Sequence, residues 1–139
     1  MVRIELVSWS EARAEASPIR FAVFVEEQKV PLEMELDEQD AACVHALARS
    51  DDGTVVGTGR LLPDGHIGRM AVLKRWRGQG VGAALLRRLI EAAHERGDQE
   101  VVLSAQIHAT GFYRKHGFRE EGTVYEDAGI PHQDMRRVL

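Results

Sequence analysis

A glycine-rich loop near the middle of the chain has the residue types and spacing of a phosphate-binding site. The loop consists of Arg77, Gly78, Gln79, Gly80, Val81 and Gly82. Glycine tolerates positive φ and has no side chain, so consecutive backbone N–H groups of such a loop can face outward. From Gly82 onward apolar residues recur every three or four positions, which predicts an amphipathic helix with Gly97 as its left-handed C-cap. The positive end of that helix dipole would meet an anion at the loop.

Two common phosphate-binding motifs do not fit this loop. A P-loop has lysine and then serine or threonine after its last glycine, whereas two alanines follow here. The dinucleotide-binding fingerprint is met in form by Gly78, Gly80 and Ala83. Its context is wrong, because residues 74–77 separate the preceding strand from the first glycine and no acidic residue closes the next strand, 101–104.

The loop instead resembles the pyrophosphate loop of the GNAT superfamily of acyl-CoA-dependent N-acyltransferases. The matching pattern is Arg77-x-x-Gly80-x-Gly82, which follows a strand-like segment at 70–72. The resemblance implies that the loop binds the pyrophosphate of acetyl-CoA, the cosubstrate. It also implies that the pantetheine amides and the thioester carbonyl are bound by the backbone of three strand residues, Met70, Ala71 and Val72.

A second pattern of the same superfamily lies one helix and one strand further along the chain. The run 109–118 resembles the signature A-x-x-F-Y-x-x-x-G-F, which places Phe112 and Tyr113 on a short helix ended by Gly117. By this resemblance Tyr113 lies beside the sulfur of coenzyme A. Many members have asparagine six residues before the phenylalanine, and Gln106 occupies that position here. The resemblance therefore implies a contact between the Gln106 amide and the cosubstrate.

Positive charge is concentrated around the glycine-rich loop. The stretch between His66 and Ile90 contains no Asp or Glu, although the whole chain has a net charge of −4. Its cationic residues are Arg69, Lys74, Arg75, Arg77, Arg87 and Arg88. Arginine forms forked contacts with phosphates, which favours a binding role for Arg77 beside the glycines. Arg87 and Arg88 equally suit an exposed basic helix face.

Acylation of an amine needs a proton donor for the leaving thiolate and a base for the amine. A phenol suits the donor role, and the resemblance assigns it to Tyr113. The alternative is that Tyr113 is a core aromatic residue paired with Phe112. The candidates for the base are Glu27, His66 and His132. His66 stands where some members of the superfamily have a catalytic carboxylate, or it is an ordinary residue of the preceding turn.

An acidic segment precedes these elements and could select the acceptor. Seven acids and one lysine lie between Glu26 and Asp40. Within this segment Leu32, Met34 and Leu36 alternate with acidic residues, which predicts one apolar side that docks and one acidic side that faces outward. The acidic residues of that side are Glu33, Glu35 and Asp37. They would bind a small cationic amine, although a solvated acidic loop has the same composition.

The order of the predicted elements indicates an α/β fold with α+β-type layers. Alternation predicts strands at 2–6, 43–49, 54–62, 66–73, 100–104, 120–125 and 133–138. Predicted helices occupy 10–16, a second stretch restarted by Ser17-Pro18, the segment after the glycine-rich loop and a short one ended by Gly117. Residues 127–132 are expected to form a loop. We therefore expect a central, mixed, mostly antiparallel sheet of about six or seven strands, flanked by about four helices.

Length and composition limit the class of protein. With 139 residues and 44% hydrophobic content, the chain is expected to form one domain over 1–139. A single cysteine and an N-terminus without a leader pattern favour a cytoplasmic protein. No apolar run suits a membrane span, and the net charge disfavours nucleic acid as a partner. The histidines form no ligand pattern, so no metal is expected.

The patterns together favour an acetyl-CoA-dependent N-acetyltransferase that acts on a small-molecule amine by direct attack in a ternary complex, as a monomer or homodimer. A non-catalytic acyl-CoA-binding module is the alternative. Such a module would keep the glycine-rich loop and lack a competent base.

Overall fold

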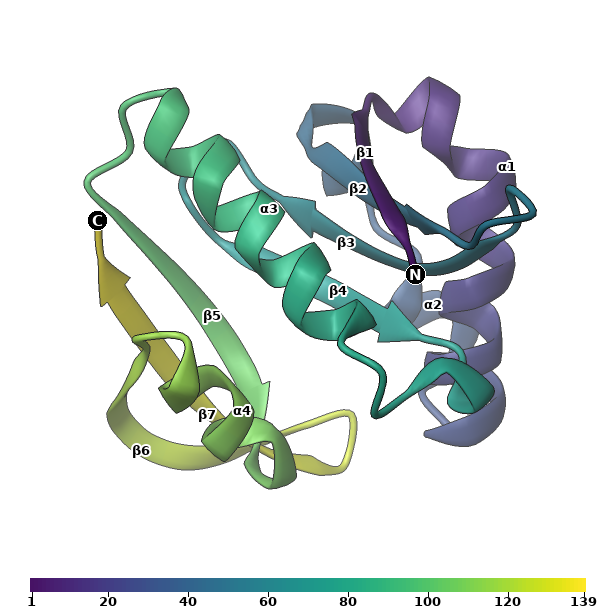
Figure 1. Cartoon of the computed structure of the whole chain (residues 1–139). Helices are drawn as coiled ribbons and strands as arrows, with labels where there is room; N and C mark the ends of the chain where they lie inside the picture. Colours follow the sequence, from purple (N-terminus) through teal and green to yellow (C-terminus); the bar gives the residue numbers. More distant parts are fainter.

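The computed structural model describes residues 1–139 and contains seven strands in two antiparallel sheets (Figure 1). The first sheet has the order β1-β2-β3-β4, formed by Arg3–Val7, Val44–Arg49, Val55–Leu61 and Ile67–Val72. The second sheet has the order β5-β7-β6, formed by Glu100–Gln106, Ile130–Val138 and Arg119–Asp127. The strands expected from alternation in the sequence are all present.

The two sheets meet at one point. His66, just before β4, forms an isolated parallel bridge with Val102 in β5, and the Val102 N–H donates to the Gly65 carbonyl at 3.1 Å. Beyond this bridge β4 and β5 diverge toward their C-terminal ends (Figure 1). The predicted parallel relation of these strands is confirmed, but the expected single mixed sheet is divided into two. The facing edges of β4 and β5 therefore share no ladder of backbone hydrogen bonds.

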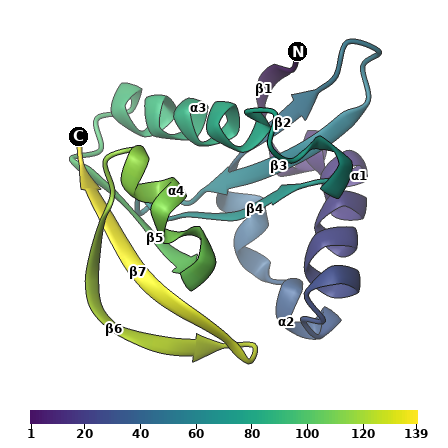
Figure 2. The same cartoon turned by 60° about the horizontal axis from the view of Figure 1, so that its bottom comes forward.

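The chain forms four α-helices, α1 at Trp9–Arg20, α2 at Leu32–Glu35, α3 at Val81–Glu95 and α4 at Thr110–Lys115. Of these, α1, α3 and α4 pack against the sheets. A π-helical segment, Phe21–Glu27, continues α1, and 3₁₀ turns occupy Glu38–Ala42, Lys74–Trp76 and Ile107–Ala109. Figure 2 shows α3 on one face of the first sheet and α1 on the opposite face. None of the helices combines the length and the apolar character needed to cross a bilayer.

The predicted interruption at Ser17-Pro18 is wrong, because α1 runs through Pro18 as one helix. Proline in a helix interior removes a hydrogen bond and normally costs about 3 kcal/mol. Here the residues on both sides of the proline form one buried stripe that packs on the first sheet. The stripe consists of Ala12, Ala16, Ile19 and Val23. Packing of this continuous stripe accounts for the unbroken helix.

The apolar face of α3 packs directly onto β3, because two glycines of that strand allow close approach. The predicted core residues Leu85, Leu86, Leu89, Ile90 and Ala93 are all buried. A Cβ added at Gly57 would lie 3.0 Å from Leu85 Cδ1. One added at Gly59 would lie 2.7 Å from Met70 Sδ and 3.0 Å from Leu89 Cδ1. The position of α3, and with it the position of the glycine-rich loop, therefore depends on these glycines.

The C-terminal hairpin is longer than the sequence predicted. β6 and β7 continue almost to the turn, so Pro131 and His132 belong to β7 and the expected loop at 127–132 is wrong. The last residue of β5 to pair with β7 is Gln106, opposite His132. Pro131 therefore lies beyond the end of β5 and is not required to donate a backbone hydrogen bond on that side.

Candidate functional site

A cavity of about 710 Å³ occupies the space where β4 and β5 diverge. Residues of both sheets, of the π-helical segment and of α4 line it. Those that matter for the chemistry are Arg69, Arg77, Gln106, Tyr113, His66 and His132. The backbone of the three predicted cosubstrate contacts, Met70, Ala71 and Val72, forms part of the same wall.

The glycine-rich loop has the backbone geometry that its sequence predicts. Gly78 and Gly80 have φ of +76° and +84°, in the left-handed region that favours glycine. Gly80 is the N-cap of α3, so the helix begins at Val81 and Gly82 lies in its first turn. The first N–H groups of a helix have no partner within the helix. The loop therefore presents free backbone donors, and the predicted C-cap at Gly97 is confirmed by its φ of +92°.

Arg77 fixes the loop to two neighbouring elements. Its Nε donates to the Val72 carbonyl at the end of β4, at 2.9 Å. Its two Nη atoms donate to the carboxylate of Glu27 at the end of the π-helical segment, at 2.9 and 2.8 Å. This contact with Arg77 holds the pKa of the Glu27 carboxyl below its ordinary value. Glu27 is therefore ionised and bound to a cation, which makes it a weak proton acceptor.

The next residue, Gln28, reaches the opposite side of the cavity. Its side-chain amide exchanges two hydrogen bonds with the amide of Gln106 at the end of β5, at 2.8 and 3.3 Å. Glu27 thus contacts the glycine-rich loop on the β4 side, and Gln28 contacts the β5 side. The last residue of the π-helical segment and the residue that follows it therefore bridge the two sheets at the wide end of the gap.

Tyr113 lies on α4 among aromatic neighbours and also lines the cavity. Its ring packs edge-on against Phe112 and Phe118, with centroids 5.1 and 6.0 Å away. Burial raises the pKa of its phenol to about 12. The hydroxyl is therefore protonated at neutral pH and available as a donor. The packing role and the chemical role considered for this residue are both compatible with its position.

The two histidine candidates lie at opposite ends of the cavity. His66 stands at the bridge between the sheets, where its Nδ1 lies 3.0 Å from Asp64 Oδ1 and its side chain is 54% exposed. His132 is 9% exposed and pairs with Gln106 at the other end of β5. Its Nδ1 lies 2.6 Å from the Ile130 carbonyl, which assigns the proton to Nδ1 and leaves Nε2 as an acceptor.

The predicted orientation of the acidic segment is wrong. Residues 32–35 form the short helix α2. The apolar residues of the segment face solvent, since Leu32, Met34 and Leu36 are 45%, 46% and 60% exposed. Glu35 is buried at 5% exposure, and Asp37 is half-buried. Glu33 alone of the three predicted acceptor contacts is exposed. The alternation of period two that the sequence suggested does not survive in a helix, whose period is 3.6 residues.

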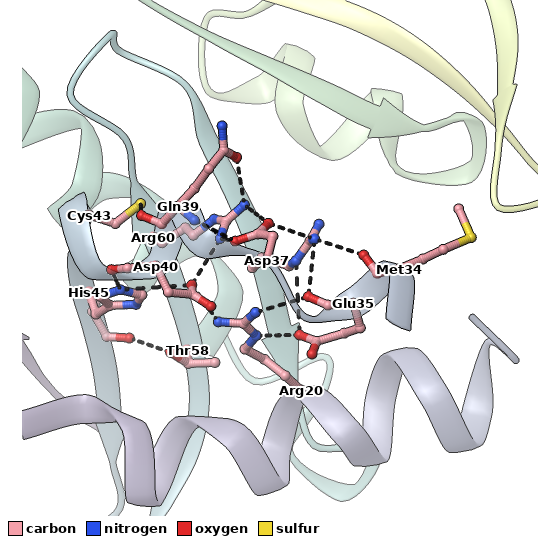
Figure 3. A network of polar contacts seen from close by, with 12 residues as sticks. Arg20, Met34, Glu35, Asp37, Gln39, Asp40, Cys43, His45, Thr58 and Arg60 are labelled. Carbon is pink, nitrogen blue, oxygen red and sulfur yellow. Dashed lines mark hydrogen bonds and ion pairs between the residues drawn. The ribbon is translucent and has the colours of Figure 1, made fainter. Parts of the chain in front are cut away.

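The buried acids are neutralised by arginines from three other elements (Figure 3). Arg20 of α1 contacts Glu35 and Asp40, and Arg60 of β3 contacts Asp37 and Asp40. We name this group of buried charges the Arg-acid cluster; its members are Arg20, Glu35, Asp37, Asp40, Arg60 and Arg69. Glu35 and Asp37 are thus held by arginines and do not form the outward-facing acidic side that the alternation predicted.

Sequence reasoning missed the arginines of this cluster. The sequence groups Arg69 with the basic residues around the glycine-rich loop, but in the structure it contacts Asp37 at 3.0 Å. Arg88, from the same group, pairs with Glu91 and Glu95 on the surface of α3. One signal was present: Arg20 stands four residues after Ala16, on the apolar stripe of α1. An arginine on a buried stripe requires a buried counter-charge.

The remaining candidate ligands, the histidines and the single cysteine, are not clustered. No three or more His, Cys, Asp or Glu side chains are grouped so as to hold a metal ion. Cys43 is buried, as predicted, and its Sγ contacts the Gln39 carbonyl at 3.1 Å.

Comparison with known proteins identifies the family. Residues 11–139 match the model of the acetyltransferase (GNAT) domain. YjcF of Bacillus subtilis, an uncharacterised N-acetyltransferase, is 39% identical over 91% of this chain and 93% of its own length. An acyl-CoA N-acyltransferase from Pseudomonas aeruginosa has the same fold, with a TM-score of 0.87, 33% identity and 99% coverage of both chains.

Escherichia coli ElaA is a further structural relative, with a TM-score of 0.87, 32% identity and 99% coverage of both chains. The agreement extends over the two sheets and the glycine-rich loop, since nearly the whole length is matched in each case. The chain therefore belongs to the GNAT family of acetyltransferases.

Proposed function

We propose that the chain transfers an acetyl group from acetyl-CoA to the primary amine of a small acceptor, by direct attack within a ternary complex. One observation carries this proposal: Arg77 and Gly82 at the two ends of the glycine-rich loop, the strand residues 70–72 and Tyr113 all line the same cavity. A cosubstrate with its pyrophosphate at the loop could place its thioester between the diverging strands.

The residues of the loop suit the pyrophosphate of acetyl-CoA. Free N–H groups at the start of α3 and the positive end of its dipole favour a phosphate there. A Cβ at Gly78 or Gly80 would meet no atom within 4 Å, so the space beside both glycines is open to a ligand. Arg77 would supply positive charge beside the pyrophosphate, and the Gln106 amide would contact the pantetheine arm.

The chemistry requires three proton transfers. An alkylamine is only about one part in a thousand unprotonated at neutral pH, so a base must remove a proton from the ammonium group. The amine nitrogen then attacks the thioester carbon, a C–N bond forms, and the carbonyl oxygen gains negative charge. When the C–S bond breaks, the thiolate takes a proton from a phenol, and the second proton of the nitrogen restores that phenol. The products are an N-acetyl amine and free coenzyme A.

Two groups of the chain are placed to assist these steps. Backbone N–H groups of residues 70–72 would stabilise the oxyanion, because the edge of β4 that faces β5 is free of sheet pairing beyond His66. Tyr113 would give its phenolic proton to the departing thiolate. Its raised pKa, about 12, keeps the phenol protonated before the reaction.

His132 is our choice for the base. Glu27 is bound to Arg77, and its lowered pKa makes it a poor proton acceptor. His66 precedes Met70 by four residues, which is about 13 Å along a strand. His132 pairs with Gln106 at the same end of the cavity as Tyr113 and keeps Nε2 free to accept a proton.

A direct assay tests the proposal. The protein is incubated with acetyl-CoA and a panel of primary amines, free thiol is followed with time, and the N-acetyl product is identified by mass. Release of thiol that depends on both enzyme and amine supports the transferase. If acetyl-CoA binds and no amine releases thiol above the rate without enzyme, the chain is an acyl-CoA-binding module.

A further inference from the structure

Arg69 has a backbone conformation that arginine rarely adopts. Its φ is +48°, and it lies at a bulge in β4. On either side of the bulge, Gly68 pairs with Arg60 and Ala71 pairs with Thr58. Two residues of β4, Arg69 and Met70, therefore lie opposite one residue of β3, Gly59. A side chain in the left-handed region is strained and persists only where its surroundings hold it. Bulges next to active sites often redirect a side chain. The bulge turns Arg69 toward α2, at the wall of the cavity.

Only one of the three guanidinium nitrogens of Arg69 donates hydrogen bonds. All its hydrogen bonds come from Nη2, which donates to Asp37 Oδ2 at 3.0 Å and to the carbonyls of Met34 and Glu35 at 3.3 and 3.2 Å. Its Nε is buried without a hydrogen-bond partner, and Nη1 donates to no protein group. The side chain is 28% exposed and lines the cavity. Arg69 thus keeps unused donor capacity beside the site.

The Arg-acid cluster has more donors than acceptors. Arg20 and Arg60 each bind two carboxylates, while Arg69 forms a hydrogen bond to only one carboxylate, that of Asp37, which Arg60 shares. The Nε of Arg60, whose side chain is 5% exposed, also lacks a partner. Burial and then repulsion from Arg60 lower the pKa of Arg69. Arg69 is therefore the least compensated cation of the cluster.

We propose that Arg69 binds a carboxylate of the acceptor, so that the acceptor is a small amino acid. This inference rests on the proposed transferase. Arg69 directly precedes residues 70–72, where the thioester carbonyl would bind, and its side chain lines the same cavity as these residues. An amine at the thioester and a carboxylate at Arg69 therefore belong to a short molecule. Arginine suits this partner, because its planar N–H donors match a carboxylate.

A carboxylate is favoured over a phosphate by the charges nearby. Glu35 and Asp37 lie in the same cluster, with Glu35 Oε1 3.9 Å from Arg69 Nε. A phosphate carries nearly two negative charges, so it would be repelled more strongly by these acids than a carboxylate would. The exposed Met34 side chain, which also lines the cavity, offers an apolar contact to the rest of the acceptor.

Binding is the first test and does not depend on turnover. The free amino acids, their amides and their decarboxylated amines, with phosphoethanolamine added, are titrated by calorimetry into the protein saturated with coenzyme A. We expect at least one amino acid to bind about tenfold or more tightly than its amide and its amine, which is about 1.4 kcal/mol. The inference is overturned if no carboxylate binds more tightly than its amide, or if phosphoethanolamine binds most tightly of all.

Variants assign the effect to Arg69. Arg69→Gln should bind the amino acid no more tightly than the amide and should leave the affinity for coenzyme A unchanged. Arg69→Gly should behave in the same way, and because it removes the strain at positive φ, a failure caused by that strain would affect Arg69→Gln and spare Arg69→Gly. The control is Arg13→Gln, an exposed arginine of α1, which should keep the preference. Equal weakening of acid and amide by both Arg69 variants would indicate a structural role only and would reject the proposal.

Thiol release measured on the same panel separates this inference from the proposed function. Carboxylate-selective binding that Arg69→Gln abolishes, without turnover of any amine, supports the Arg69 site and rejects the transferase. Turnover of simple amines with no preference for a carboxylate supports the transferase and rejects the Arg69 site.

Discussion

The Arg77 guanidinium donates two hydrogen bonds, of 2.8 and 2.9 Å, to the Glu27 carboxylate, although the two residues are fifty positions apart in the sequence. The pair connects the glycine-rich loop to the end of the π-helical segment. A third bond, from Arg77 Nε to the Val72 carbonyl, connects the loop to β4. Glu27 is therefore an anchor for Arg77, and the following predictions start from this assignment.

Glu27→Gln should lower the stability of the fold and leave chemistry nearly intact. The folded pKa of Glu27 lies below 4.5, so its ionised form stabilises the protein above that pH. The stabilisation is lost as the pH falls through the folded pKa. The difference in Tm between parent and variant should therefore be largest near neutral pH and should disappear in acid. We expect kcat within about threefold of the parent; a loss of about 100-fold would identify Glu27 as the base.

Gly80→Glu should weaken acetyl-CoA binding by about tenfold or more, which is about 1.4 kcal/mol. The variant places a negative charge where the phosphates approach. Gly80 has φ of +84°, so any side chain adds strain, and Gly80→Ala is the matched control for that strain. The dissociation constants of both variants are measured by calorimetry. Equal affinities for the two would show that charge at this position does not matter and would remove the loop from the binding site.

Tyr113→Phe should retain acetyl-CoA affinity and lose about 10- to 1000-fold in kcat, because it deletes one hydroxyl and keeps the ring. Since the pKa of Tyr113 is about 12, the parent enzyme should show no loss of activity from deprotonation of this group between pH 7 and about 10. Rates at saturating substrates over this range check both statements. Turnover within about twofold of the parent would make Tyr113 a packing residue.

His132→Gln and His66→Gln distinguish the two histidines. If His132 is the base, its replacement should reduce kcat by about 100-fold and leave the affinity for acetyl-CoA unchanged. His66→Gln should change kcat by less than about fivefold, because His66 lies about 13 Å along the strand from Met70. The reverse result would move the base to the bridge between the sheets.

Gly57→Ala should destabilise the protein by about 1 to 3 kcal/mol, because the added methyl group overpacks the contact between β3 and α3. Its Cβ would lie 3.0 Å from Leu85 Cδ1, 3.2 Å from the Ala71 carbonyl oxygen and 3.2 Å from Val81 Cγ1. Gly68→Ala is the control, because a Cβ there meets no atom within 4 Å. Urea unfolding of both variants gives the comparison. Equal stabilities would mean that α3 can move away from β3 freely.

The parts of the fold that depend on local patterns were predictable. The glycine-rich loop, the apolar face of α3 and the cap at Gly97 follow from backbone freedom and helical spacing, and they occur as predicted. The continuous α1 was not predictable from Pro18, because the burial that overrides the proline comes from strands distant in sequence.

The acidic segment shows why the acceptor side was harder to predict. The alternation from Leu32 to Asp37 fits a strand with an acidic outer side, and nothing nearby in sequence contradicts that reading. The buried position of Glu35 depends on Arg20, fifteen residues earlier. The half-buried position of Asp37 depends on Arg60, twenty-three residues later. Such long-range pairing of charges leaves no periodic trace in the sequence.

Because β4 and β5 are joined only by the bridge between His66 and Val102, the fold gives up backbone pairing where the cavity lies. If β4 and β5 stayed paired to their ends, the fold would gain several backbone hydrogen bonds, each worth about 1 kcal/mol. The same pairing would fill the cavity. Laboratory evolution for heat resistance alone should therefore favour variants in which the two strands close on each other, whereas selection for a ligand keeps them apart.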